Sequence, residues 1–423
     1  MLHEALADTL RAETIAPECI RPAWNDYCFA NVPDTVLSLF GNGSKAVRPL
    51  PDAVFDGVMT EFDHVVLAFI DGFGWNHFQR VRHDHSFLTR LTEHATVTPL
   101  TAGYPSETAA AVSTIHTGHQ PVEHGVLGWD AHVPSLGGYI QTLPFTDHEH
   151  TPLGEVRTNP DPADLIDEST LYERLDARSV LIQPARINEN PYNAQVTRGA
   201  KLVNYENSAQ AAYRVRAQLE GTTEPTYCYC YLSHVDTFSH THGVVHEETD
   251  AQLASVCRAI EREIVEKLDP TVAERTLLLV LADHGEIDTI PPERINSGSF
   301  DLDRHLQRDE QGNPIPVVGG PRNLQFHARE GHRNALHTAL EDCLTPLDPL
   351  VLDRERIIDE DLFGDREPSE RFKRRCPDVL VVPRTGFARD ADDPLTKVGM
   401  HGGLHPDEML IPFAAARIDA LQE

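Results

Sequence analysis

The sequence has few lysines and no long apolar run. Only five of its 36 basic residues are lysine, and no apolar stretch reaches about 18 residues. A transmembrane helix is therefore excluded, since crossing a bilayer takes about 20 mostly apolar residues. Residues 1–18 also lack an apolar core and a twin-arginine pair. We therefore expect a cytoplasmic protein without a membrane partner.

Paired cysteines are also missing. The seven cysteines are scattered, odd in number and form no C-x-x-C motif. Cys228 and Cys230 alternate within an apolar run, so they would face the same side of a strand. We expect buried free thiols rather than disulfides or a thiolate metal site.

Negative charge is abundant. Asp and Glu number 66 against 36 Lys and Arg, which gives a net charge of −30. The acids are spread along the chain, which disfavours an acidic tail. An acidic, lysine-poor surface predicts a halophilic protein, because high salt screens its self-repulsion. The same charge excludes stable binding of nucleic acid. The oligomeric state stays open.

Several segments have the pattern of buried parallel strands. They are short apolar runs rich in Val, Leu and Ile, at residues 64–70, 179–183, 227–233, 276–281 and 378–382. Helical patterns lie between them, notably at residues 108–117 and 246–268. This alternation predicts an α/β fold with a mostly parallel central sheet and helices on both faces.

One stretch interrupts the alternation. Residues 290–375 are polar and turn-rich at first, and then contain one strand-like and two helix-like segments. We expect a small inserted α+β cap there, and an α/β core made of residues 1–289 and 376–423. The insertion lies between two ligand motifs, so it is positioned to cover the site. Residues 130–175 are also irregular and form a second candidate flap.

Potential metal ligands follow several of the apolar runs. Ligands of parallel sheets collect at the carboxyl ends of the strands. Oxygen and imidazole ligands suit a borderline divalent ion such as zinc or manganese. Three other histidines compete as ligands: His234, His242 and His246. The six candidate ligands are Asp71, Asp236, His240, Asp283, His284 and His401.

A hydroxyl residue begins the predicted helix 108–117. Ser106 and Thr108 both lie in PSETAAAVSTIHTG, and either suits a helix N-cap. Beside three Asp and three His, a hydroxyl also suits catalysis, because a helix N-terminus favours a phosphate and a metal activates the hydroxyl for attack. This constellation predicts two adjacent divalent ions, a nucleophile and transfer of a phosphoryl-type group.

The motifs resemble those of the alkaline phosphatase superfamily and, within it, the nucleotide pyrophosphatase/phosphodiesterase branch. The resemblance runs from Asp71 to about residue 413 and keeps the order of the motifs. The P-[ST]-x-T nucleophile motif is similar to PSET, which ends at Thr108. The other motifs are D-x-x-x-H-x-x-G, D-H-G and two H-G pairs, matched at Asp236–Gly243, Asp283–Gly285, His124–Gly125 and His401–Gly402.

The resemblance implies an alkaline phosphatase-like core and a set of roles. One ion is held by Asp236, His240 and His401. The other is held by Asp71, Asp283, His284 and the Thr108 oxygen. Thr108 forms a covalent phosphoryl intermediate that water then hydrolyses. The implied enzyme is a two-metal hydrolase of phosphodiester or pyrophosphate bonds, acting on a small phosphorylated substrate such as a nucleotide. Zinc is the expected metal, with manganese as the alternative.

The substrate pocket departs from the pattern of the family. Trp129 and Ala111 stand where relatives carry asparagines. Trp129 and Tyr104 are our candidate substrate-binding residues, with core packing as the alternative, and we expect His405 beside the site rather than in it.

Other functions on the same core remain open. They are a phosphomonoesterase, a phosphonate hydrolase, a phosphosugar mutase and a non-catalytic metal-binding scaffold. A sulfatase is disfavoured, because no C/S-x-P-x-R motif surrounds Thr108.

Overall fold

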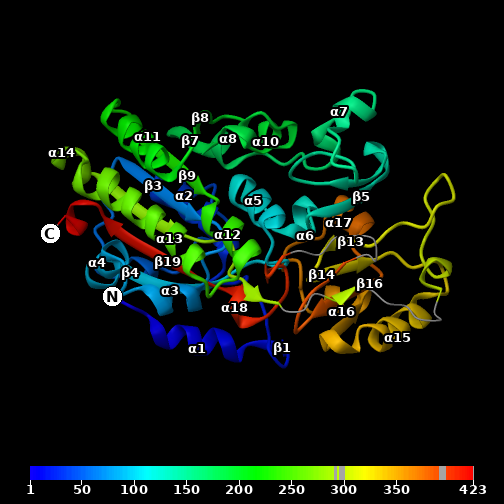
Figure 1. Cartoon of the computed structure of the whole chain (residues 1–423). Helices are drawn as coiled ribbons and strands as arrows, with labels where there is room; N and C mark the ends of the chain where they lie inside the picture. Colours follow the sequence, from blue (N-terminus) through cyan, green and yellow to red (C-terminus); the bar gives the residue numbers. More distant parts are fainter. Residues whose placement is uncertain (290–292, 295–300, 390–396, 423) are drawn as a thin grey trace.

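A seven-stranded sheet forms the centre of the computed structural model, which describes residues 1–289, 293–294, 301–389 and 397–422. The strands from β10 to β8 pair in parallel, and β19 runs antiparallel to both of its neighbours. The predicted α/β fold with a mostly parallel central sheet is confirmed (Figure 1). In spatial order the strands are β4 (Thr96–Thr101), β19 (Leu410–Arg417), β10 (Thr276–Leu281), β3 (His64–Ile70), β9 (Thr226–Leu232), β7 (Arg178–Pro184) and β8 (Lys201–Tyr205).

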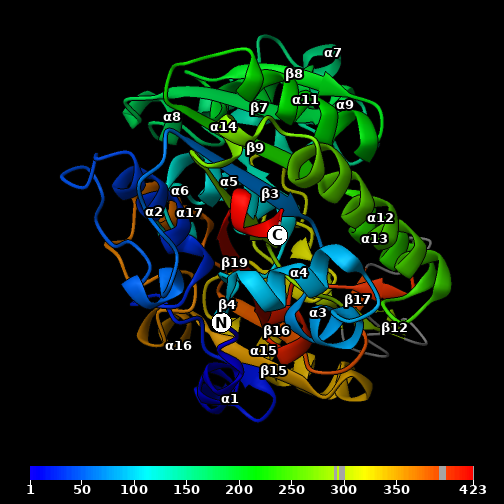
Figure 2. The ribbon, with the colours of Figure 1, turned by 90° about the vertical axis from the view of Figure 1, so that its left-hand side faces the viewer.

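Helices cover both faces of this sheet (Figures 1 and 2). On one face α11 (Ser208–Glu220) contacts β7, β8 and β9 and packs on α13 (Glu247–Ile260). On the other face lies α5 (Thr108–Thr117), whose His116 ring is centred 5.1 Å from that of Tyr229 in β9. The whole length of β3, β9 and β10 is buried between the two layers. This double burial explains why these strands read as continuous apolar runs.

Both predicted helices are present. The first is α5, which ends where Gly118 takes a left-handed conformation with φ of 70°. The second is α13, which begins after His246 and continues as a π-helical segment over Glu261–Glu266.

A second, antiparallel sheet lies beside the first. The predicted parallel strand at 378–382 was wrong in its partners, because β16 pairs antiparallel with β14 and β15. Its apolar run indicates that the strand is buried on both faces, but burial does not determine whether the neighbouring strands run parallel or antiparallel. The order is β15 (Pro349–Asp353), β16 (Val379–Pro383), β14 (Asn323–Phe326), β13 (Val318–Gly320), β5 (Asp130–Val133) and β6 (Gly138–Gln141).

The predicted insertion contributes three of these six strands. It also contains helices α15 (Arg333–Cys343), α16 (Arg354–Asp359) and α17 (Glu370–Arg375). Strands β5, β6 and β16 of the same sheet come from outside the insertion, and β5 and β6 belong to the irregular region 130–175. Parts of the insertion, at residues 290–292 and 295–300, lie outside the described residues. The boundaries at 290 and 375 stay a prediction.

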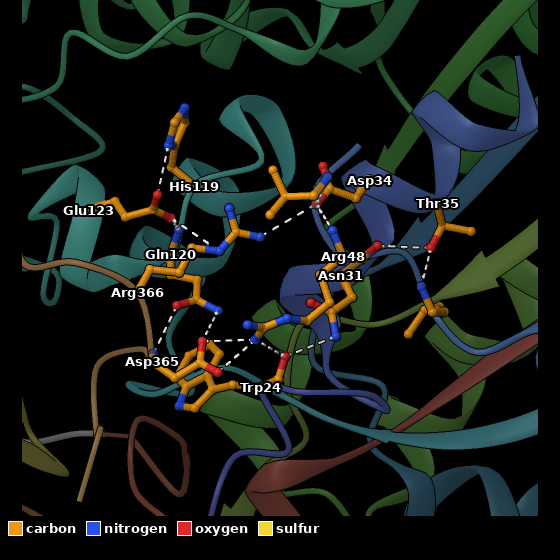
Figure 3. A network of polar contacts seen from close by, with 12 residues as sticks. Trp24, Asn31, Asp34, Thr35, Arg48, His119, Gln120, Glu123, Asp365 and Arg366 are labelled. Carbon is orange, nitrogen blue, oxygen red and sulfur yellow. Dashed lines mark hydrogen bonds and ion pairs between the residues drawn. The ribbon is translucent and has the colours of Figure 1, made fainter. Parts of the chain in front are cut away.

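A polar network joins segments that are distant in the sequence (Figure 3). Arg48 donates hydrogen bonds of 2.7 and 2.9 Å to the two carboxylate oxygens of Asp365. Arg366 lies 3.5 Å from Asp34 and 3.9 Å from Glu123. We call the ten residues labelled in Figure 3 the Arg48–Asp365 network. It ties together residues 24–48, 119–123 and 365–366.

The cysteines are all free thiols, as predicted, and Cys343 is the one that is partly exposed. Across the described ranges, no helix combines the length and the apolar character that spanning a bilayer requires.

Candidate metal centre and active site

The six predicted metal ligands meet at the carboxyl ends of three adjacent strands. Asp71 follows β3, the pair Asp283–His284 follows β10, and α12 (His234–His242) begins just after β9. Strand β18 (Gly399–Met400) pairs with β11 (Ile287–Asp288) and brings in the last histidine. We call this set the carboxylate–histidine cluster. Its members are Asp71, Asp236, His240, Asp283, His284 and His401.

One half of the cluster is built around Asp236. Its Oδ1 atom lies 3.3 Å from Nε2 of His240 and 3.4 Å from Nε2 of His401. One ligand atom from each residue falls within 4.8 Å of the other two. Three donors at this spacing form a candidate site for one divalent ion.

The other half is built around His284. Its Nε2 atom lies 3.6 Å from Asp71 Oδ1, 3.4 Å from Asp283 Oδ2 and 3.2 Å from the Thr108 hydroxyl. Asp71, Asp236 and His284 form a second group of ligand atoms within 4.8 Å of one another. The two halves are adjacent, because Asp236 belongs to both groups.

The hydrogen bonds of the three histidines fix which nitrogen faces the site. The Nδ1 atoms of His240, His284 and His401 lie 2.8, 3.1 and 3.0 Å from the backbone carbonyls of Gly399, Gly285 and Ser106. A carbonyl only accepts, so each Nδ1 carries the hydrogen and donates it. Each neutral ring therefore presents the lone pair of Nε2 to the carboxylates, as metal-bound histidines do.

The carboxylates are short of hydrogen-bond donors. Asp71 Oδ1, Asp236 Oδ1 and Asp283 Oδ2 are buried and have no hydrogen-bond partner. Within the described part of the chain, no Lys or Arg forms an ion pair with any of these three acids. Buried polar atoms are normally paired, and an unpaired buried carboxylate is costly. The donor set therefore fits divalent cations.

Burial is also the main cause of the pKa shifts in the cluster. Burial raises the pKa of Asp283 to about 6, and burial together with the charges of Asp283 and Asp236 raises the pKa of Asp71 well above its ordinary value. At Asp236 burial also opposes ionisation, but the histidines, His240 first, outweigh it and lower the pKa. Burial lowers the pKa of His240 and His284 to about 4, so neutral imidazoles cannot balance the acids at neutral pH.

A fourth carboxylate, which the sequence reasoning missed, lies behind the cluster. Glu286 directly follows the D-H-G motif, its side chain is fully buried, and neither of its oxygens has a hydrogen-bond partner. Its Oε2 lies 3.9 Å from Nδ1 of His240, and burial followed by the charge of Asp236 raises its pKa. The sequence signal was its place directly after the D-H-G motif.

Comparison with known families identifies this arrangement. The family model of type I phosphodiesterase / nucleotide pyrophosphatase matches residues 65–404. The chain belongs to this family. It is therefore a hydrolase of the alkaline phosphatase superfamily, as the motifs predicted. Phosphodiesterases of this family typically bind metals, and the chain carries His and Asp groups able to do so.

Solved structures support the same fold. Ectonucleotide pyrophosphatase/phosphodiesterase 5 from mouse is 17% identical, with a TM-score of 0.59 over 83% of this chain and 87% of that one. An inactive variant of the mouse protein, in complex with AMP, is 16% identical, with a TM-score of 0.59 over 84% of this chain and 88% of that one. Phosphonoacetate hydrolase from Sinorhizobium meliloti is 15% identical, with a TM-score of 0.54 over 85% of this chain and 94% of that one. Comparison with curated proteins found no match.

Within this phosphodiesterase fold, Thr108 and Ser106 occupy different positions. Thr108 is the first residue of α5, and its hydroxyl faces His284. The Ser106 hydroxyl donates to the carbonyl of Gly403 at 2.8 Å and accepts from the Gly402 amide at 3.2 Å. Ser106 therefore holds the loop that carries the last histidine, and neither residue is the N-cap.

The N-cap of α5 is Glu107, whose side chain makes no hydrogen bond to the first turn of the helix. Its carboxylate accepts from the backbone amide of Trp129 at 2.8 Å and from the side chain of Asn323 at 3.4 Å. A Cβ atom at Gly320 or Gly402 would lie 2.2 or 2.7 Å from the same carboxylate. Glu107 therefore packs between the second sheet and the His401 loop.

A cavity of about 480 Å³ opens beside Thr108, Asp71 and Asp236. Trp129 lines it, and its role in substrate binding stays a prediction. Tyr104 does not: it is fully buried, and its hydroxyl donates to Asn323 at 3.0 Å. Tyr104 is close to Thr108 in the sequence, but its side chain packs away from the cavity that Thr108 lines.

The remaining histidines lie outside the cluster. His242 and His246 form a separate surface group with Glu248, and the backbone amide of Asp407 donates to His405 at the start of α18 (Pro406–Met409). The ring of His234 stacks against that of Tyr205. Spacing along the sequence did not distinguish these rings from that of His240, which groups with Asp236 and His401 in the folded chain.

Proposed function

We propose that the protein hydrolyses phosphodiester or pyrophosphate bonds with two divalent metal ions and a covalent phosphothreonine intermediate. Membership of the phosphodiesterase family supports the reaction class. The observation that carries the metal assignment is the set of three Nε2 lone pairs directed at three buried carboxylate oxygens that lack donors.

Two ligand sets would hold the ions. Asp236, His240 and His401 would hold one, and Asp71, Asp283, His284 and the Thr108 oxygen would hold the other. Bound ions of this kind polarise a phosphoryl group and lower the pKa of an oxygen nucleophile. We propose zinc, because imidazole and carboxylate donors suit it, with manganese as the alternative.

Thr108 would act as the nucleophile. Its oxygen forms a bond to phosphorus while the bond to the leaving oxygen breaks, and water later cleaves the phosphothreonine. The first-turn amides of α5 have no partners within the helix, and they can donate to the oxygens of a phosphoryl group at the helix N-terminus. They would offset the missing asparagines, since Ala111 and Trp129 cannot provide those hydrogen bonds.

We propose a nucleotide-like substrate. The AMP complex of the mouse protein, although of low identity, makes a nucleotide the first substrate to test. The cavity beside Thr108 offers the ring of Trp129 as a surface for a flat group. A diester carries less charge than a monoester and has a second arm that fills such a cavity, so we expect diesters to be preferred.

A substrate panel on metal-loaded protein in molar KCl tests the proposal. It compares p-nitrophenyl phosphate, bis-p-nitrophenyl phosphate, a nucleoside triphosphate and a dinucleotide. We expect kcat/KM for the aryl diester to exceed that for the monoester about tenfold or more, and Trp129→Ala to shrink this ratio. A better rate with p-nitrophenyl phosphate would instead assign a phosphomonoesterase, and no turnover of any ester would favour a phosphonate hydrolase, a mutase or a binding scaffold.

A further inference from the structure

One wall of the cavity comes from a segment that carries none of the family motifs. It consists of the end of β7, the short helix α9 (Ala185–Asn188) and α10 (Pro191–Val196). Gln183, Arg186 and Asn193 line the cavity from this wall. The hydroxyl of Tyr192 lies 2.6 Å from that of Ser113 in α5, so the wall is fixed against the helix that carries the nucleophile.

Arg186 is exposed, and its described contacts include no acidic partner. Its guanidinium makes a 3.4 Å hydrogen bond to the hydroxyl of Ser233. Among the described residues, no carboxylate forms an ion pair with it, although the chain has 66 acidic residues against 36 basic ones. Arg186 is also the one cationic residue that lines this cavity in the described part of the chain. A guanidinium presents a planar fork of donors that matches a carboxylate or a phosphate.

Two amide side chains of the same wall each have one polar atom without a hydrogen-bond partner. Gln183 and Asn193 are each 2% exposed, and both line the cavity. Gln183 Oε1 and Asn193 Nδ2 have no hydrogen-bond partner. Leaving such a buried atom unpaired is unfavourable. One unpaired acceptor and one unpaired donor on a cavity wall therefore point to a ligand that carries both kinds of group.

We infer that this wall binds an organic arm of the substrate that carries an anionic group. Arg186 pairs with the anion, which is a carboxylate or a phosphoryl group, and Gln183 and Asn193 bind the polar edge of a ring or an amide. This inference rests on the proposed function, because it names the substrate class of that site. It also adds positive charge to a cavity whose other charged lining residues, Asp71 and Asp236, are acidic.

Three p-nitrophenyl phosphodiesters test the charge. They share one leaving group and differ in the second arm, which is phenyl, 4-carboxyphenyl or 4-phosphonophenyl. The salt is kept at the lowest KCl concentration that preserves the fold, because molar salt screens a partly exposed charge. We expect the charged arms to raise kcat/KM about tenfold over phenyl, and Arg186→Met to remove that advantage while the phenyl ester keeps its rate. Comparing the two charged arms distinguishes a carboxylate ligand from a phosphoryl ligand.

Arg262→Met is the matched control. It removes the same charge from an exposed arginine of the π-helical segment, whose nearest acid is Glu263 at 3.5 Å. It should leave the preference of the wild-type protein unchanged. Equal rates for all three esters in the wild-type protein, or an equal loss on all three in Arg186→Met, would overturn the inference.

The amide pair has its own readout. Gln183→Met should raise the thermal stability, because it removes a buried unpaired oxygen, and should lower kcat/KM for the p-nitrophenyl ester of thymidine 5′-monophosphate about fivefold or more. The phenyl ester should be unaffected. A Gln183→Met protein that is less stable and equally slow on both esters would show a purely structural role.

If the proposed function is wrong, the result differs from a failure of the Arg186 inference. In that case the wild-type protein would turn over none of the esters. Calorimetric titration of Thr108→Ala with phenyl phosphate and with 4-carboxyphenyl phosphate still decides the inference. We expect tighter binding of the carboxylated compound, with the difference lost in Thr108→Ala/Arg186→Met. Equal affinities would reject the binding role of Arg186.

Discussion

The carboxylate–histidine cluster and the Arg48–Asp365 network both gather polar side chains from distant parts of the chain, but they balance charge differently. In the network each acid has a guanidinium nearby, since Asp365 pairs with Arg48, and Arg366 lies near Asp34 and Glu123 (Figure 3). In the cluster the imidazoles of His240 and His284 are neutral, no Lys or Arg of the described residues pairs with the acids, and three carboxylate oxygens lack donors.

We interpret this difference as the one between a structural network and the proposed metal site. A network in which every acid has a guanidinium nearby can stabilise the folded chain without a bound ligand. Buried carboxylates without cations destabilise the folded protein. Binding of a metal ion would remove this repulsion, which favours metal binding. The comparison yields five predictions, from the largest effect to the smallest.

The largest effect should come from removing the metals. Chelation should abolish activity, and metal analysis of the active protein should give about two equivalents per chain. Asp283→Ala should lower that occupancy, because His284 and Asp71 alone cannot hold the second ion at neutral pH. Full activity in EDTA, with no metal detected, would remove the distinction between cluster and network.

Replacing the nucleophile should rank next. Thr108→Ala should lower kcat by roughly 10⁴-fold or more while it largely preserves the fold and the metal content. Thr108→Ser should keep measurable activity, since the hydroxyl remains. Ser106→Ala is the control. If Ser106→Ala is inactive and Thr108→Ala is active, the nucleophile is two residues earlier.

Glu286→Met tests whether the additional buried carboxylate supports metal binding. Glu286→Met should stabilise the metal-free protein by about 1–3 kcal/mol, because it removes a buried carboxylate without a partner. The same change should weaken metal affinity about 10- to 100-fold. Denaturation of the metal-free protein and metal titration measure the two effects. A loss of stability in the metal-free state would contradict this interpretation.

The network should respond in the opposite way. Arg48→Ala should destabilise the protein by about 1–3 kcal/mol, because Asp365 would then lack its cation and both side chains are largely buried. The rate should stay within about twofold, since the pair is absent from the catalytic cavity. A double-mutant cycle with Asp365→Ala should show coupling, and additive losses would argue against the pair.

Salt should have the smallest and most diffuse effect. The net charge of −30 predicts that thermal stability rises from dilute buffer to molar KCl, because screening reduces repulsion across the whole surface. Thermal melts over a KCl series measure this. Equal or greater stability in 50 mM salt would contradict a halophilic adaptation.

The sequence predicted most of what is local or carried by a motif. Strands β3, β7, β9 and β10 are buried on both faces, so their apolar runs were visible. The six ligands follow strands or lie in recognisable motifs, and the structure brings all of them to one place. Their catalytic and metal-binding roles stay predictions.

What the sequence left hidden depends on tertiary pairing. The direction of β16 is set by β14 and β15, which its own residues do not specify. Arg186 and Glu286 carry no motif, and their importance comes from partners that they lack in the folded chain. Tyr104 shows the opposite error. It is close to Thr108 in the sequence and was a candidate for substrate binding, but it is buried against Asn323.

The position of Glu107 has a consequence for how this fold can be altered. The residue adjoins Thr108, accepts hydrogen bonds from Trp129 and Asn323, and packs against Gly320 and Gly402. Glu107 thus connects the second sheet, Thr108 and the loop that carries His401. Transplanting the second sheet from a relative would therefore retune Thr108 unless the graft also supplies a counterpart for Glu107. In this chain, the packing of the second sheet and the position of Thr108 are therefore coupled through one side chain.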